Sequence, residues 1–401
     1  MELKPAVAGR GAITALGNGV APILESVRVN SSGLRPGPPN GNRSRETSVA
    51  GWIPEDAENA VAAAHGGPED ARAFRLAREA MRQAIDGSPW NQCAATRRGL
   101  VLATTKADLP ALERLHAGGP CSPEARRHAR PALLAVDLAA ACEVAGPVRC
   151  VSVACVSGLL AVQQASRLIQ RGLCDVVMVV GVDLLSHFVL TGFMALKSLD
   201  PEGCRPFDRA RVGLSVGEAG AAIVLARSDR VFVPAWRVRG WGSSNDANHL
   251  TGPSRDGSGL ALALDRALQV AGMNCREIDY LNAHGTGTPF NDAMEAHAFR
   301  RVFGESIPPF GSSKGMFGHT LGAAGILETI VCLTALDAGL LPGTPRLSDP
   351  DPVVPPSVLQ LPRPANAART MVKVNCGFGG TNAALVLEKD ETPQGSRKPS
   401  T

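Results

Sequence analysis

The 401-residue sequence has no apolar run long enough to cross a membrane. A spanning helix needs roughly 18 or more consecutive residues that are apolar and uncharged, and no stretch reaches that length. The first residues also lack the charged-then-apolar layout of a secretory signal peptide. We therefore expect a cytoplasmic protein with no membrane span.

The sequence also lacks closely spaced cysteine pairs. Its ten cysteines are spread singly, and no C-x-x-C pair occurs. Structural zinc sites use such pairs, and small secreted folds use a disulfide framework. We therefore expect reduced thiols and no bound metal.

A strong excess of charge of one sign is missing as well. The chain carries 41 Lys and Arg residues against 37 Asp and Glu residues, a formal net charge of +4. Nucleic-acid-binding proteins are typically far more basic, so we expect no nucleic-acid partner.

The sequence does contain alternating short apolar runs and amphipathic helical patterns. Residues 100–104, 176–182 and 221–226 are apolar or β-branched, which is typical of strands buried on both faces. Residues 157–171 and 320–338 have helical patterns. With 44% hydrophobic residues, the chain is long enough to bury a large core. This alternation predicts a layered α/β fold.

Cys155 lies where an apolar run changes into a helical pattern, in the segment Val-Ser-Val-Ala-Cys-Val-Ser-Gly-Leu-Leu. A cysteine at such an elbow lies near the unpaired N–H groups of the helix, which favour thiolate over thiol and could stabilise an oxyanion. Taken alone, a cysteine in an apolar run is more often an inert core residue.

Two later segments strengthen the functional interpretation. His284 ends an apolar run and is followed by Gly-Thr-Gly-Thr, and a second loop-to-helix junction contains Lys314, His319 and Glu328. A cysteine with two histidines suits carbon–carbon bond formation on thioesters, because the sulfur holds the acyl group while two imidazoles bind an enolate. This chemistry needs no metal.

The chain resembles the β-ketoacyl-[acyl carrier protein] synthases of the thiolase-like superfamily. The resemblance is to the elongating Cys-His-His type found in type II fatty acid and polyketide synthesis. It rests on the Cys155 elbow and five further motifs, at residues 7–17, 206–220, 280–288, 311–328 and 377–382. The motifs extend over nearly the whole chain.

The resemblance implies a duplicated fold. Two pseudo-symmetric halves would stack in α-β-α-β-α layers, with residues 1–228 carrying the nucleophile and residues 229–389 carrying the histidines. Residues 390–401 are polar and lack an apolar anchor, so we expect a disordered tail.

The resemblance also implies roles for the site residues. Cys155 would accept the acyl group, and His284 and His319 would bind the malonyl thioester carbonyl and stabilise the enolate formed on decarboxylation. Lys314 and Glu328 would form a buried pair that orients the site.

Residues of two further motifs match family residues that line the acyl pocket or bind the arm carrying the substrate. Phe378, between Gly377 and Gly379, would gate the acyl pocket, and its N–H would join that of Cys155 in an oxyanion hole. Thr286 and Thr288 match hydroxyls that hold the phosphopantetheine arm of an acyl carrier protein. No cofactor of the enzyme itself is expected.

Clusters of basic residues match the carrier-docking surface of these synthases. A solvated helix face is the simpler interpretation of such charge runs. The matching residues are Arg72, Arg75, Arg126, Arg127, Arg130 and Lys197.

In related synthases the first half's sheet continues into a partner subunit. We associate this continuation of the sheet with the apolar strand at residues 174–182, and we expect a two-fold dimer. The partner could be a second copy or a related ketosynthase-like subunit.

Some residues depart from the family pattern. Residues 375–380 form a loop one residue shorter than usual, and Val156, Met316 and Phe317 are bulky replacements that could narrow the acyl entrance. They favour specialised polyketide or lipid synthesis over housekeeping fatty acid synthesis. Cys376 resembles the second cysteine of degradative thiolases.

Three alternatives therefore stay open. The first is a thiolase acting on coenzyme A thioesters. The second is a priming decarboxylase, against which Cys155 argues because those enzymes carry glutamine there. The third is a non-catalytic partner of the chain-length-factor kind, which lacks the nucleophile.

Overall fold

The computed structural model describes residues 4–37, 49–66, 71–231, 235–365 and 367–390. The predicted tail at 390–401 lies outside this part of the chain except for Asp390. In the described ranges, none of the helices is both long enough and apolar enough to span a membrane.

The first half of the chain forms a mixed five-stranded arrangement. Its order is β6 (Val148–Val151), β5 (Arg98–Ala103), β7 (Val176–Asp183), β8 (Ala219–Arg227) and β1 (Pro5–Thr14). Strand β5 is parallel to both of its neighbours, whereas β8 is antiparallel to β7 and β1.

The second half repeats the same topology. Its order is β11 (Phe310–Gly311), β10 (Tyr280–Asn282), β14 (Thr370–Gly377), β15 (Thr381–Lys389) and β9 (Trp236–Asn245). If the five strands of each half are numbered in chain order, their order across the sheet is 3-2-4-5-1 in both halves. In each half the fifth strand is antiparallel to both of its neighbours. The predicted duplication is therefore confirmed.

Strands β1 and β9 connect the two halves into one continuous sheet. They pair at Ala6 and Arg237, so that eleven strands are joined, including the short β2 (Gly17–Asn18) beside β1. The predicted boundary at residues 228 and 229 falls between the end of β8 and the start of β9. The division into two domains stays a prediction.

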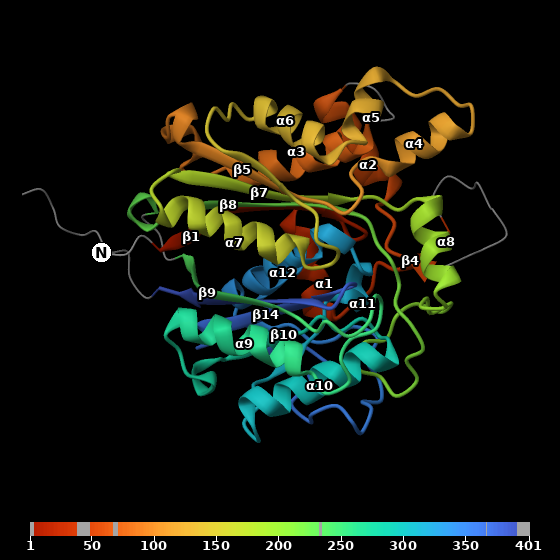
Figure 1. The fold of residues 1–401 in the computed structure, drawn as a ribbon, viewed down its shortest axis with the longest axis vertical. Coiled ribbons are helices and arrows are strands. Elements are labelled where there is room, and N and C mark those ends of the chain that lie inside the picture. The colour runs from red at the N-terminus through yellow and green to blue at the C-terminus, as the bar shows by residue number, and fades with distance from the viewer. Residues whose placement is uncertain (1–3, 38–48, 67–70, 232–234, 366, 391–401) are drawn as a thin grey trace, which may run out of the picture.

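Helices cover both outer faces and fill the space between the two arrangements of strands (Figure 1). The outer layer of the first half contains α3 (Arg72–Ile85) and α6 (Pro131–Ala141). The middle layer contains α1 (Val20–Val29), α7 (Ser157–Gln170) and α12 (Ala324–Asp337). The outer layer of the second half contains α9 (Ser258–Ala271) and α10 (Pro289–Phe303). This is the predicted α-β-α-β-α layering.

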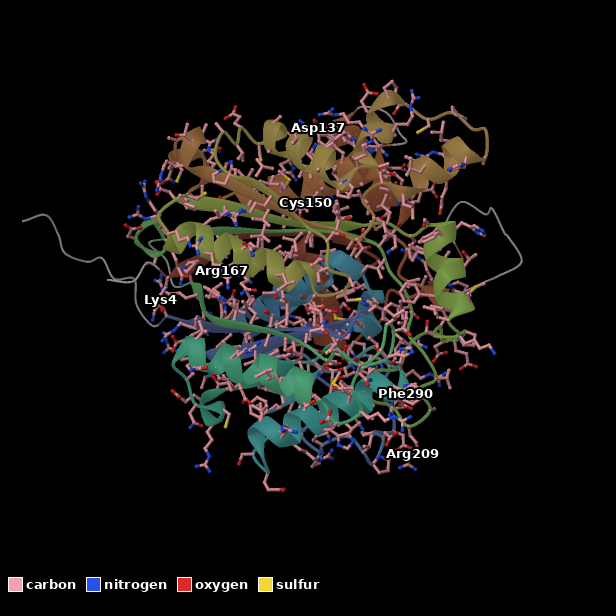
Figure 2. The ribbon with its side chains drawn as sticks, in the orientation of Figure 1. Lys4, Asp137, Cys150, Arg167, Arg209 and Phe290 are labelled. Atoms are coloured by element: carbon pink, nitrogen blue, oxygen red, sulfur yellow. The ribbon has the colours of Figure 1, made fainter. Side chains whose placement is uncertain are left out.

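The apolar pattern of the sequence explains this stacking. In β7, Val177 and Val179 pack into the middle layer, whereas Val176, Met178 and Val180 pack into the outer core. A strand that is apolar at every position must be covered on both faces. Figure 2 shows side chains filling the space between the layers.

The elements predicted from the sequence are confirmed within a few residues. Helix α7 covers 157–170 of the predicted 157–171, and the predicted 320–338 helix begins as a short 3₁₀ turn before α12. The remaining elements are α2 (Glu55–His65), α4 (Leu109–His116), α5 (Pro123–His128), α8 (His187–Ala195), α11 (Lys314–Phe317), β3 (Arg35–Pro36), β4 (Val49–Ala50), β12 (Leu340–Leu341) and β13 (Arg363–Pro364).

The expectation for the sheet edge needs correction. Strand β7 is hydrogen-bonded on both sides, to β5 and β8, so it cannot continue into a partner. Among the described strands of the first half, β6 is at the end of the order, with Val148, Arg149 and Cys150 exposed. The sheet can therefore be extended at β6.

Candidate active site

Cys155 sits on a tight elbow between β6 and α7. The preceding residue, Ala154, has a left-handed backbone with φ 43°, a conformation that costs energy in a residue with a side chain. The Ser157 hydroxyl closes the turn, because it accepts the Val153 N–H at 2.8 Å and donates to the Ala154 carbonyl at 2.7 Å. The elbow thus fixes the position of the cysteine.

His284 follows β10 and is held through its backbone. Its N–H and that of Gly285 donate to the two oxygens of Glu295 at 2.6 and 2.7 Å. Gly285 has φ 45°, and a Cβ there would lie 2.4 Å from the Cβ of Ser312. The glycine lets the chain turn sharply directly after the histidine.

His319 is held by a loop from the other half of the molecule. Its N–H donates to the Ser215 carbonyl at 2.7 Å, and its carbonyl accepts the Gly217 N–H at 2.9 Å. The preceding Gly318 has φ 75°, and a Cβ on it would lie 2.6 Å from the Val216 carbonyl oxygen. The 206–220 motif therefore positions a histidine distant in sequence.

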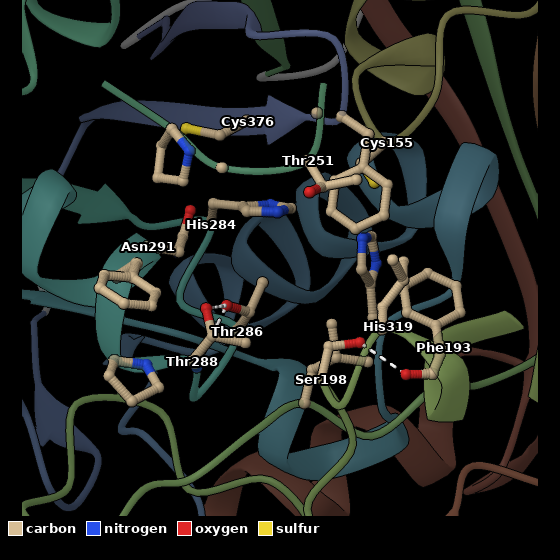
Figure 3. Close-up of a pocket in the computed structure, with 18 of the residues that line it drawn as sticks. Cys155, Phe193, Ser198, Thr251, His284, Thr286, Thr288, Asn291, His319 and Cys376 are labelled. Atoms are coloured by element: carbon tan, nitrogen blue, oxygen red, sulfur yellow. Dashed lines mark hydrogen bonds between the residues drawn. The ribbon is translucent and has the colours of Figure 1, made fainter. Parts of the chain in front are cut away.

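These three elements bring Cys155, His284 and His319 together, as Figure 3 shows. The cysteine sulfur and one ring nitrogen of each histidine all lie within 4.8 Å of one another. The imidazole centroids are 5.1 Å apart, with the rings at 84°. All three residues line a pocket of about 470 Å³, to which Thr286, Thr288, Gly377, Phe378 and Lys197 also contribute.

The hydrogen bonds assign the same tautomer to both histidines. His284 Nδ1 accepts from Asn375 Nδ2 at 3.0 Å and lies 3.3 Å from Lys314 Nζ. His319 Nδ1 accepts the Leu321 N–H at 3.2 Å. Because a neutral imidazole carries one proton, both Nε2 atoms are N–H donors.

Burial keeps both imidazoles neutral. It lowers the pKa of His319 to about 3 and that of His284 well below its usual value, and the nearby Lys314 adds to both shifts. Two neutral donors are suited to binding a carbonyl oxygen that becomes negative.

The expectation of a resting thiolate at Cys155 needs correction. Burial raises the pKa of Cys155 to about 11, although Lys314, Lys106 and a hydrogen bond from the Phe378 N–H oppose it. Cys155 as a whole residue is only 8% exposed, so the loss of hydration raises the thiol pKa more than the nearby helix N-terminus lowers it. Cys155 is therefore a thiol at neutral pH and must lose its proton during acyl transfer.

Behind the histidines lies a buried cluster of charges. Lys314 Nζ contacts Glu328 Oε1 at 2.5 Å and donates to the His284 carbonyl at 2.6 Å. Lys373 contacts the other oxygen of Glu328 at 2.7 Å, and Asn375 Nδ2 donates to that oxygen at 3.2 Å. The two lysines lower the pKa of Glu328 against its burial.

The sequence reasoning assigned no role to Lys373, Asn375 or Glu295. The available signal was a lysine between two valines in an otherwise largely apolar run, Met-Val-Lys-Val-Asn. Such a lysine must find a partner inside the protein.

The loop around Phe378 lies over the nucleophile. The Phe378 ring packs against Phe193 with centroids 5.8 Å apart, and Phe378 as a whole residue is 36% exposed. Gly379 has φ 84°, which favours glycine. Thr286 and Thr288 also line the pocket, and their hydroxyls lie 2.8 Å apart (Figure 3).

The bulky replacements do not line this pocket. Val156, Met316 and Phe317 are buried in the middle-layer core and are not among the residues that line the pocket. Cys376 does line the pocket, and burial raises its pKa well above the usual value.

The predicted docking surface at Arg72 and Arg75 also needs correction. Arg72 is held between Glu58 and Glu218, and Arg75 is only 6% exposed. Helix α3 lies against the sheet, so these residues stabilise the fold and offer no free charge. Arg126, Arg127, Arg130 and Lys197 are exposed, although Arg127 contacts Asp137 at 2.7 Å.

The comparisons assign the family. Residues 5–230 match the family described as "Beta-ketoacyl synthase, N-terminal domain", and residues 236–348 match its C-terminal domain. The chain belongs to the β-ketoacyl synthase family. The resemblance inferred from the motifs is confirmed.

Individual relatives agree with the family. Nodulation protein E of Rhizobium meliloti is 36% identical over 78% of this chain and 80% of its own length. The 3-oxoacyl-[acyl-carrier-protein] synthase 2 of Coxiella burnetii is 29% identical over 96% and 98%. A mitochondrial 3-oxoacyl-[acyl-carrier-protein] synthase of Arabidopsis thaliana is 37% identical, and the matched part spans 56% of that sequence.

Solved structures agree with the fold. The ishigamide ketosynthase/chain length factor structure is 28% identical, with a TM-score of 0.87 over 97% of this chain and 99% of the other. A ketosynthase in complex with its chain length factor from Xenorhabdus doucetiae is 29% identical, with a TM-score of 0.84 over 97% and 98%. A β-ketoacyl synthase from Burkholderia phymatum is 26% identical, with a TM-score of 0.86 over 98% and 100%.

Proposed function

We propose that this protein is a 3-oxoacyl-[acyl carrier protein] synthase that condenses an acyl group on Cys155 with a malonyl thioester. The observation that carries the proposal is the buried triad, in which one thiol and two neutral imidazoles lie within 4.8 Å. A thiol holds the acyl group and two N–H donors bind the enolate, which is the division of labour that the reaction needs.

The first step transfers the acyl group to the enzyme. The Cys155 sulfur forms a bond to the acyl carbon while the bond from that carbon to the pantetheine sulfur breaks. The thiol proton ends on the departing pantetheine sulfur. The N–H of Phe378, which hydrogen-bonds with the Cys155 sulfur, is positioned to stabilise the oxyanion of this step.

The second step forms the new carbon–carbon bond. The Nε2–H groups of His284 and His319 bind the malonyl thioester carbonyl, the malonyl carboxylate leaves as carbon dioxide, and the electron pair moves into an enolate. The enolate carbon attacks the acyl carbon, and the Cys155 sulfur leaves as a thiolate, which takes up a proton from water and returns to the thiol. The two carbons added per cycle come from the malonyl group.

The pocket gives access for a substrate on a flexible arm. It extends from Cys155 to the exposed Lys197 and includes Thr286 and Thr288, whose hydroxyls can hold a phosphopantetheine arm. We therefore propose that an acyl carrier protein delivers the substrate and docks on the exposed Arg126, Arg130 and Lys197. We also propose that the enzyme acts in the cytoplasm.

A chain-length-factor-like partner subunit is the second candidate. Two of the similar solved structures are described as a ketosynthase with a chain length factor. The intact triad favours the catalytic role for this chain and leaves the partner role to a related subunit in a heterodimer.

Intact-protein mass spectrometry tests the function. The native protein is mixed with acyl carrier proteins loaded with acyl groups of different lengths, and malonyl carrier protein is then added. We expect an acyl adduct on Cys155 and a 3-oxoacyl carrier product, and neither with the Cys155→Ala variant. An adduct that persists in Cys155→Ala would contradict the assignment and point to Cys376.

A further inference from the structure

Strand β14 inserts a second lysine into the charge cluster behind the histidines. Along this strand Met371 packs into the middle layer, whereas Val372 and Val374 pack into the outer core. The alternation of a strand therefore directs Lys373 toward α12, which carries Glu328. Lys373 is fully buried, with 0% of its surface exposed.

The ammonium of Lys373 has its hydrogen-bonding capacity filled. It contacts Glu328 Oε2 at 2.7 Å and donates to the carbonyls of Ala283 and Val374 at 2.9 and 2.7 Å. Ala283 directly precedes His284. Lys373 therefore holds both the carboxylate behind the histidine and the backbone before it.

The cluster contains more positive than negative charge. Lys314 already neutralises Glu328 through its other oxygen at 2.5 Å. Burying a further ammonium is unfavourable until its partners compensate the lost hydration, and Glu328 needs no second cation for neutrality. Burial lowers the pKa of Lys373, and the Glu328 carboxylate opposes that shift. With both lysines protonated around one carboxylate, one positive charge is in excess.

Other charged groups face His284 and His319 from the surrounding elements. Glu295 accepts the His284 N–H, and burial raises its pKa to about 7, so it is only partly ionised at neutral pH. Asp292 lies beside Arg211 at 3.7 Å. Lys106 adds further positive charge near His319. Asp183 is a further buried carboxylate beside the site, where it accepts the Gly322 N–H at 2.7 Å and raises the pKa of Cys155.

We propose that Lys373 is a positioning residue for the condensation: it fixes His284 through Glu328, Asn375 and the Ala283 carbonyl, and it supplies the excess positive charge that stabilises the enolate. The inference rests on the proposed function, because it assigns the residue to the decarboxylation step. Charge in a water-excluded site acts strongly on a developing anion.

The experiment compares two lysines that connect the second half's sheet to the same helix. Lys373→Met removes the buried contact with Glu328. Lys389→Met is the matched control, because Lys389 contacts Asp337 at the end of α12 at 2.7 Å but is partly exposed. Acyl loading of Cys155, malonyl decarboxylation as a function of pH, and NMR titration of labelled histidines are measured for each.

For Lys373→Met we expect decarboxylation to fall roughly tenfold, the change that one pKa unit represents, while acyl loading stays within about twofold. Both histidines should start to protonate at a higher pH than in the parent, because Lys373 is one cause of their lowered pKa. Acid should therefore inactivate the variant at a higher pH. The Lys389→Met control should match the parent.

Two further variants keep the test decisive. In Lys373→Met combined with Glu328→Gln, one net positive charge is restored, and the histidine titration should return toward that of the parent. If Lys373→Met does not fold, Lys373→Gln keeps a donor for the Ala283 carbonyl without the charge and takes its place.

The proposal is overturned if the histidines titrate in the variant as in the parent, or if loading and decarboxylation fall equally. A protein without any decarboxylation or condensation would instead contradict the proposed function. The titration would still decide the role of Lys373, since it requires no turnover.

Discussion

At the scale of residues, the site depends on how burial sets the protonation of three groups. Removal from water favours the neutral form of every titratable side chain, so Cys155 remains a thiol and both histidines remain imidazoles. The lysines of the cluster oppose protonation of the histidines and favour a negative charge in the pocket. The same interior thus suits neutral ground states and an anionic intermediate.

This arrangement predicts that the two histidines contribute more to malonyl decarboxylation than to acyl loading of Cys155. Replacing His284 or His319 by alanine should slow malonyl decarboxylation on the order of 100- to 1000-fold, the usual cost of losing one donor to an oxyanion. Acyl loading of Cys155 should change far less. Single-turnover decarboxylation and mass spectrometry of the acyl-enzyme measure the two steps separately, and equal losses would contradict the assignment.

At the scale of elements, the sequence predicted the parts of the site that lie at element ends. Cys155, His284 and His319 each follow a strand or precede a helix, so local patterns and motif resemblance were enough to find them. Lys373 was missed because its partner Glu328 lies on a different element, and only the folded chain brings them together. Local sequence does not specify such contacts.

The predicted docking residues show that local sequence also does not reveal which basic side chains are paired inside the fold. The resemblance assigned Arg72 and Arg75 to a docking surface, but it did not indicate that their side of α3 contacts other elements. Arg72 pairs with Glu218, 146 residues away, which no local pattern indicates. The exposed residues on and beside α5 were predicted by the same reasoning and are accessible.

Charge reversal on the exposed residues tests the carrier surface. Arg126→Glu, Arg130→Glu and Lys197→Glu together should raise the KM for acyl carrier protein about tenfold at low salt, because exposed charge pairs contribute up to about 1 kcal/mol each and steer encounter. Turnover of a small acyl thioester should be unchanged. Arg276→Glu, at another exposed arginine, is the control. Equal loss with both substrates would show that the residues are structural.

At the scale of the whole molecule, the two halves are interdependent. The nucleophile comes from the first half and the histidines from the second, and the Ser215–Gly217 segment of the first half holds His319 of the second. The middle layer of helices is buried between the two arrangements of strands. Neither half alone contains the site, so the activity requires the complete duplicated fold.

The remaining edge of the sheet predicts assembly. Strand β6 leads into the Cys155 elbow, and exposed apolar side chains lie on and beside it, with Val136 at 49%, Val148 at 37% and Val153 at 36% exposure. An unpaired strand edge with apolar neighbours is a template for association. We expect a two-fold dimer through β6 that buries upwards of about 2,000 Å².

Cys150→Asp introduces a charge at this edge and should convert the dimer to a monomer of 41.7 kDa, measured by light scattering at micromolar concentration. Condensation should fall with it, because the edge continues directly into the nucleophile elbow. Leu262→Asp, at an exposed leucine on α9, is the control and should leave both unchanged. A parent protein that is a stable, active monomer would contradict the dimer. A parent that is insoluble alone but soluble with a related ketosynthase-like subunit would favour the heterodimer.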